Sequence, residues 1–145
     1  MVKIINRQKI KRINLKSLSK YLKKVSSLLN ISSKKFTVII CDNRLIKALN
    51  KKYLGKNSTT DVLAFPLTDI HEPDFLGEVV VSLAKAVSTS AKLGIRWQDE
   101  LMLYIVHGIL HFCEYDDRTK RESMRMQKKQ EEILEALSRK DYIRI

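Results

Sequence analysis

Cysteine, proline and glycine are scarce in this chain of 145 residues, which has two cysteines, two prolines and four glycines. Cys41 and Cys113 are too far apart to form the closely spaced pair of a cysteine-ligated metal site. We therefore expect reduced thiols, with Cys113 as a packing residue. No stretch approaches the roughly 18 uncharged apolar residues of a membrane span, and Met1 to Arg7 lack the apolar segment of a signal peptide. These absences favour a cytoplasmic protein without a membrane partner.

The chain also lacks internal repeats, linkers and low-complexity tracts. Its composition, 44% hydrophobic and 30% charged, is that of a soluble globular protein. A chain of this length buries roughly two-thirds of its unfolded surface. We therefore expect one domain, residues 1–145.

Basic residues outnumber acidic ones by 28 to 16, which gives a formal net charge of +12. Such an excess favours a polyanionic partner, because each neutralised phosphate releases counterions. Charge by itself does not separate RNA from DNA or from an anionic membrane surface.

Two of the three histidines stand four residues apart, at the end of the apolar run 101–106. On a helix, His107 and His111 share one face, so both imidazoles can reach one metal ion. Asp117, six residues past His111, can close the site after the chain leaves the helix. Zinc accepts these donors, and three protein ligands leave a position open for water, as in catalytic sites. Gly108 is unfavourable inside a helix, which indicates that something packs closely beside His107.

The alternative is that His107 and His111 are core residues whose ring nitrogens are hydrogen-bonded within the protein. The four-residue spacing of the two histidines favours metal ligation over this alternative. The helical pair is similar to the zincin pattern. However, the residue after His107 is Gly108 rather than the glutamate that serves a metalloprotease as general base. A peptidase is therefore disfavoured. The sequence indicates no general base, so the expected reactive group is the metal-bound water.

Periodicity predicts an α+β fold with a single mixed sheet of about four strands, covered by about five helices. The first two strands are joined by a helix, which favours parallel pairing. The third and fourth strands are joined by a short loop, which favours antiparallel pairing. The third strand ends at Pro66, which suits a position at the edge of the sheet. His71, in the loop 68–74, is expected on the surface, and the tail after Lys140 is expected to fray. In the last helix, Met124, Ile133, Leu134 and Leu137 are expected to face inward. The expected strands are 2–6, 36–41, 62–65 and 77–82, and the expected helices are 15–29, 43–54, 83–93, 97–111 and 118–139.

Three blocks resemble the YbeY family of bacterial endoribonucleases, also called rRNA maturation factors. They are His107-Gly-Ile-Leu-His111 with Tyr115-Asp116-Asp117, the segment Thr60 to Pro66, and the segment Leu76 to Ser82. The resemblance implies an α+β fold with the histidine helix central, and a metal-dependent endoribonuclease specific for single-stranded RNA that acts on ribosomal RNA. It also implies one divalent metal, zinc by preference, held by His107, His111 and Asp117.

This chain departs from the family pattern at three positions. Asp117 replaces a third histidine, so manganese or magnesium would compete better with zinc, and Asp116 is the rival for that third place. Glu114 replaces a glycine at a turn that favours positive φ, at a cost of order 1 kcal/mol. Leu54 replaces an arginine associated with the active site, which removes a candidate for stabilising phosphate charge.

Two other functions stay open on the sequence. One is a non-catalytic ribosome-assembly or RNA-binding factor with a structural metal, and the other is a metallohydrolase of another substrate class. For RNA, the candidate contacts are Lys51, Lys52 and Lys56, which precede the Thr60 to Pro66 block.

Overall fold

The structure, a computed structural model, describes residues 1–67 and 69–145. The loop expected at 68–74 begins at Thr68, which lies outside these residues, and His71 is exposed, as predicted. The chain combines helices and strands in an α+β fold, as predicted. The described elements are β1 (Val2–Arg7), α1 (Leu15–Leu28), β2 (Lys35–Cys41), α2 (Asn43–Leu54), β3 (Val62–Pro66), β4 (Phe75–Ser82), α3 (Leu83–Leu93), α4 (Trp97–Leu110), η1 (His111–Cys113) and α5 (Lys120–Leu137).

Within the described residues the strands form a four-stranded mixed sheet of order β1-β2-β4-β3. β2 pairs with β1 and β4 in parallel, and β3 pairs with β4 antiparallel, so both predicted strand directions are confirmed. β3 is an edge strand, as its terminal Pro66 predicted, because proline has no N–H for a further partner.

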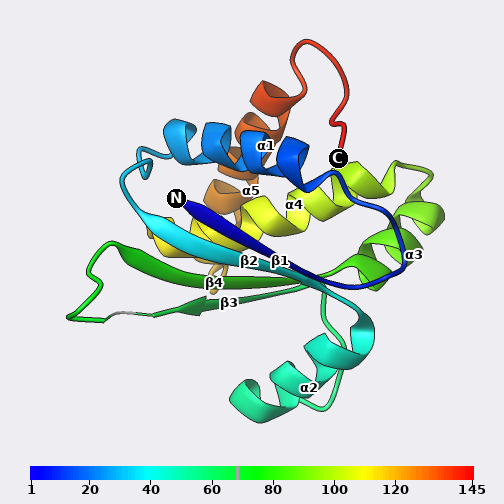
Figure 1. The fold of residues 1–145 in the computed structure, drawn as a ribbon, viewed down its shortest axis with the longest axis horizontal. Coiled ribbons are helices and arrows are strands. Elements are labelled where there is room, and N and C mark those ends of the chain that lie inside the picture. The colour runs from blue at the N-terminus through cyan, green and yellow to red at the C-terminus, as the bar shows by residue number, and fades with distance from the viewer. Residues whose placement is uncertain (68) are drawn as a thin grey trace.

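The sheet is covered unequally on its two faces. Figure 1 shows α1, α4 and α5 on one side and α2 on the other. The main core lies on the first side, where Leu101, Ile105 and Ile109 of α4 are fully buried with Val79 and Val81 of β4. A smaller apolar cluster lies under α2. No helix in the described part of the chain is long and apolar enough to cross a membrane.

The inward face of α5 differs from the expectation at one residue. Met124 is 62% exposed, whereas Met126 is 1% exposed, so the prediction for Met124 is wrong. Met126, Ile133 and Leu137 share one face at helical spacing. Met124 is two residues from Met126, and two residues turn a helix by about 200°, which places Met124 on the opposite side.

The C-terminal tail is also packed rather than frayed, which corrects the expectation for residues after Lys140. Ile143 and Ile145 are buried in the main core. Ser17 Oγ donates to the Arg144 carbonyl at 2.6 Å, and Arg96 Nη2 donates to the Ile143 carbonyl at 2.6 Å. The alternating isoleucines supply enough apolar surface to hold the segment against α1 and α4.

Gly108 marks the closest approach of α4 to the sheet. A Cβ built on Gly108 would lie 2.4 Å from Val79 Cγ1 and 3.2 Å from Val62 Cγ2. Both valines are β-branched and stiff, so neither moves aside cheaply. The close contact inferred from the glycine is therefore present, and it fixes the helix turn that carries His107 against β3 and β4.

We predict that Gly108→Ala destabilises the fold although alanine is the better helix former. The helix gains about 1 kcal/mol, and overpacking costs about 1–3 kcal/mol, so the free energy of unfolding should fall by up to roughly 2 kcal/mol in urea titrations. The exposed α5 change Ser123→Ala is the control and should stay within about 0.5 kcal/mol. Adding Val79→Ala should show favourable coupling with Gly108→Ala. A Gly108→Ala chain more stable than the wild type by the full helix gain of about 1 kcal/mol, with no coupling to Val79→Ala, would contradict the contact.

Candidate metal centre

His107 and His111 stand where α4 passes into η1. His107 lies in the last turn of α4, and His111 begins η1 one helical turn later. Their ring centroids are 5.1 Å apart with an interplanar angle of 77°. Both side chains are half-buried, so one edge of each ring is accessible.

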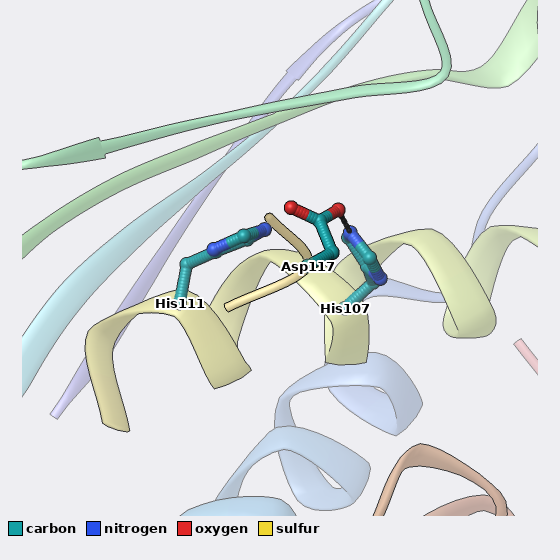
Figure 2. A group of neighbouring side chains, drawn as sticks. All are labelled: His107, His111 and Asp117. Carbon is teal, nitrogen blue, oxygen red and sulfur yellow. Dashed lines mark ion pairs between the residues drawn. The ribbon is translucent and has the colours of Figure 1, made fainter. Parts of the chain in front are cut away.

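The chain then reverses at Glu114 and returns Asp117 to the histidines. Glu114 has φ 63°, in the left-handed region that disfavours a side chain, so the predicted strain at this position is confirmed. The Tyr115 N–H donates to the Leu110 carbonyl at 3.2 Å, which closes the turn. As Figure 2 shows, Asp117 then points at the two rings, with Oδ2 3.7 Å from His107 Nε2.

The three side chains offer a donor set that fits a divalent metal. One imidazole nitrogen from each histidine and one Asp117 oxygen all lie within 4.8 Å of one another. Two ligands of a tetrahedral zinc ion, bound at 2.0–2.1 Å, are about 3.4 Å apart. The His107–Asp117 separation of 3.7 Å is close to this value. Small side-chain movements therefore suffice to hold an ion.

Asp116, the rival for the third place, is engaged elsewhere. Its Oδ2 forms an ion pair with Arg118 Nε at 3.0 Å. Its Oδ1 accepts a hydrogen bond from the Asp117 N–H at 2.8 Å. Of the two aspartates, Asp117 is the one grouped with the imidazoles.

Gln130 of α5 contacts the His107 ring at Nδ1, the nitrogen that does not face Asp117. Gln130 Oε1 lies 3.0 Å from His107 Nδ1. With the Gln130 amide in this orientation its oxygen accepts, so the neutral ring carries its proton on Nδ1. The Nε2 lone pair is then free on the side where Asp117 lies. Gln130 is thus the outer partner that metal-binding histidines generally have.

The pKa of His111 is lowered, first by burial and then by the neighbouring His107, with Asp117 and Asp116 opposing. The unfolded chain therefore takes up a proton at His111 before the folded chain does as pH falls below about 6.5. Without metal, folding stability should fall in that window. The neutral ring needed for metal binding correspondingly persists to lower pH.

An open cleft of about 800 Å³ surrounds the three side chains. Among the described residues that line it, Arg118 is the one arginine or lysine. Leu54, the residue in place of the family arginine, also lines it, whereas Lys51, Lys52 and Lys56 do not. The carboxylates on its wall belong to Asp61, Glu114, Asp116 and Asp117.

Comparisons with known proteins place the chain among members of one family. The family model for endoribonuclease YbeY matches residues 3–138. The endoribonuclease YbeY of Carboxydothermus hydrogenoformans is 39% identical over 101 residues, which cover 70% of this chain and 71% of the relative. That of Neorickettsia sennetsu is 35% identical over 126 residues, covering 86% and 88%. The solution structure of TM1509 from Thermotoga maritima, 26% identical, gives a TM-score of 0.69 and covers 94% of this chain and 89% of that one.

The sequence did not single out Gln130 or Arg118. Nothing in the charged helix distinguishes Gln130, because its role depends on how α5 packs across α4. Arg118 directly follows Asp117, but its ion pair with Asp116 becomes evident only from the turn geometry.

We predict that Gln130→Ala lowers metal affinity by roughly 10- to 100-fold, the usual effect of losing an outer hydrogen-bond partner. The reason is that the His107 ring loses the contact that fixes its tautomer and orientation. Gln127→Ala is the matched control, because Gln127 is exposed on the same helix and its side chain donates to Glu131. Competition with a chromophoric chelator measures both affinities. Equal affinities for the two variants would show that the Gln130 contact is incidental.

Proposed function

The chain belongs to the endoribonuclease YbeY family, and we propose that it is a metal-dependent endoribonuclease that cleaves single-stranded RNA during ribosomal RNA maturation in the cytoplasm. The observation that carries the proposal is the convergence of His107, His111 and Asp117 in an open cleft. The whole chain, residues 1–145, acts as one domain in this proposal.

His107, His111 and Asp117 hold one divalent ion, with zinc the preferred metal because two donors are imidazoles. Asp117, a harder ligand, makes manganese and magnesium better competitors than a third imidazole would. When bound, such an ion supplies Lewis acidity at a phosphate oxygen and makes water a better nucleophile. Gln130 keeps the His107 ring in the orientation and tautomer that binding requires.

The distribution of charge supports an RNA substrate. The chain carries +12 overall, but the cleft wall carries four carboxylates and one arginine among the described lining residues. An empty acidic cleft repels a phosphate backbone, so substrate binding depends on the ion. Basic residues outside the cleft then attract the rest of the strand.

Arg118 is proposed to contact a phosphate of the RNA. It would take the place of the family arginine, which Leu54 replaces in this chain. Its Nε is held by Asp116 at 3.0 Å, while its side chain is 85% exposed. The two terminal nitrogens are therefore available to bind phosphate oxygens, a geometry for which guanidinium is well suited. The ion pair with Asp116 limits the directions in which the guanidinium points.

Lys51, Lys52 and Lys56 are proposed to guide the strand toward the cleft. Lys51 and Lys52 lie in the last turn of α2, and Lys56 follows the left-handed Gly55 that ends this helix. Leu54, which lies between them in the sequence, lines the cleft, so the three lysines are within three residues of a cleft residue along the chain. Their contribution should be mainly salt-dependent affinity.

We predict cleavage of a single-stranded RNA that a chelator abolishes and added zinc or manganese restores. Asp117→Ala should lose metal and most activity, whereas Asp117→His should bind zinc more tightly and keep cleaving, because imidazole is the softer donor. Metal content and cleavage are measured on the same untagged protein.

The matched control is Asp74→Ala, which removes a surface carboxylate paired with Lys34 at 3.5 Å. It should change neither metal content nor rate. Chelator-resistant cleavage would contradict a metal-dependent reaction. RNA binding with bound metal but no cleavage would instead favour an RNA-binding assembly factor with a structural ion.

We predict that Arg118→Ala lowers kcat/KM by about 10²- to 10³-fold, as expected for loss of a preorganised charge-stabilising donor. Metal content should be unchanged, because Arg118 contacts Asp116 rather than the three grouped side chains. Leu54→Arg, added to Arg118→Ala, should recover part of the rate by returning a guanidinium to the same cleft. A wild-type rate for Arg118→Ala would remove this residue from the reaction.

A further inference from the structure

A second cavity, of about 220 Å³, lies on the face of the sheet that α2 covers. Its wall is mainly apolar, with Ile39 from β2, Leu49 and Tyr53 from α2, and Phe65 and Leu67 at the edge strand. Glu78 of β4 supplies a carboxylate to this wall.

The cavity is open toward solvent beside two aromatic rings. Tyr53 and Phe65 have ring centroids 5.3 Å apart at an interplanar angle of 59°. Tyr53 is 58% exposed and Leu67 is 43% exposed, so large apolar groups line its mouth. A half-exposed aromatic ring such as that of Tyr53 is the kind of surface on which a planar base stacks.

This cavity and the metal cleft lie on opposite sides of the edge strand β3 and are lined by neighbouring residues of two elements. On α2, Tyr53 lines the cavity and Leu54 lines the cleft. On β3, Phe65 lines the cavity and Pro66 lines the cleft. On each element, the residue that lines the cavity is thus directly followed by one that lines the cleft, at the edge of the sheet formed by β3.

The charge beside the cavity fits a polyanion. Helix α2 carries Arg44, Lys47, Lys51 and Lys52 and has no acidic residue. Lys52 Nζ lies 5.2 Å from the centre of the Tyr53 ring. Aromatic faces flanked by cations are the general means by which proteins hold single-stranded nucleic acid, the ring stacking a base and the cation meeting the phosphate.

We propose that the cavity between α2 and β3 is a nucleobase subsite for the same RNA strand whose phosphate enters the metal cleft. The inference rests on the proposed function and assigns it a substrate-binding residue, Tyr53. The base stacks on the Tyr53 ring with the inclined Phe65 ring beside it, Glu78 accepts a hydrogen bond from a base N–H, and Lys52 contacts the adjoining phosphate. The edge strand β3 lies between the base and the reacting phosphate.

The test is an abasic scan of a short single-stranded RNA, with binding measured by fluorescence anisotropy on the zinc-loaded protein at low temperature, where gel analysis confirms that the strand stays intact. For the wild type, removing the base at one position should weaken binding by roughly 5- to 100-fold, the range for one base–aromatic stack. Tyr53→Ala should weaken binding of intact RNA by a similar factor and make that position insensitive to base removal. Tyr53→Phe keeps the ring and should retain both properties.

Tyr142→Ala is the matched control, since Tyr142 is 53% exposed and lies in the C-terminal tail. It should leave RNA affinity and the abasic profile unchanged, and thermal melts should show that all variants fold. If the wild type binds RNA but Tyr53→Ala behaves as this control does, the subsite is wrong and the proposed function stands. If the wild type binds no RNA, both fail. A wild-type dimer that Tyr53→Ala converts to monomer, with RNA affinity unchanged, would assign the surface to contact between copies instead.

Discussion

The close approach of α4 to the sheet at Gly108 is the constraint on which the rest of the site depends. With no side chain there, Val79 and Val62 pack directly against the helix backbone. This contact sets how high the last turn of α4 lies above the edge strand β3. His107 and His111 are therefore held at the edge of the sheet, where a strand of substrate has access. The turn at Glu114 then needs only a short loop to return Asp117 to them.

A second consequence is the contrast between the cleft and the surface around it. The chain is strongly basic, yet the wall around the histidines is rich in carboxylates. Such a wall favours a cation and disfavours a polyanion until the cation is bound. In the proposed function, metal and Arg118 together reverse this local potential, while the basic helix α2 supplies the long-range attraction. Binding of metal and binding of RNA are then expected to be thermodynamically coupled.

The sequence allowed the sheet, its edge strand and the grouping of the histidines to be anticipated, because each follows from local rules. Helical spacing brought His107 and His111 together, Pro66 placed β3 at an edge, and Gly108 indicated a close contact. Features that depend on packing between distant segments were not predictable in the same way. The partner of His107 on α5 and the tail buried through Ile143 depend on helix crossing and on the room left beside the core.

The proposed function depends most directly on where an ion binds. A crystal structure of the zinc-loaded chain, with anomalous differences collected on both sides of the zinc edge, locates the metal without assumptions about ligands. We predict one ion per chain, bound by His107, His111 and Asp117 at about 2.0–2.2 Å, with a fourth position facing the cleft. An ion at another site, or at this site with Asp117 turned away and the fourth position closed by another side chain, would contradict it.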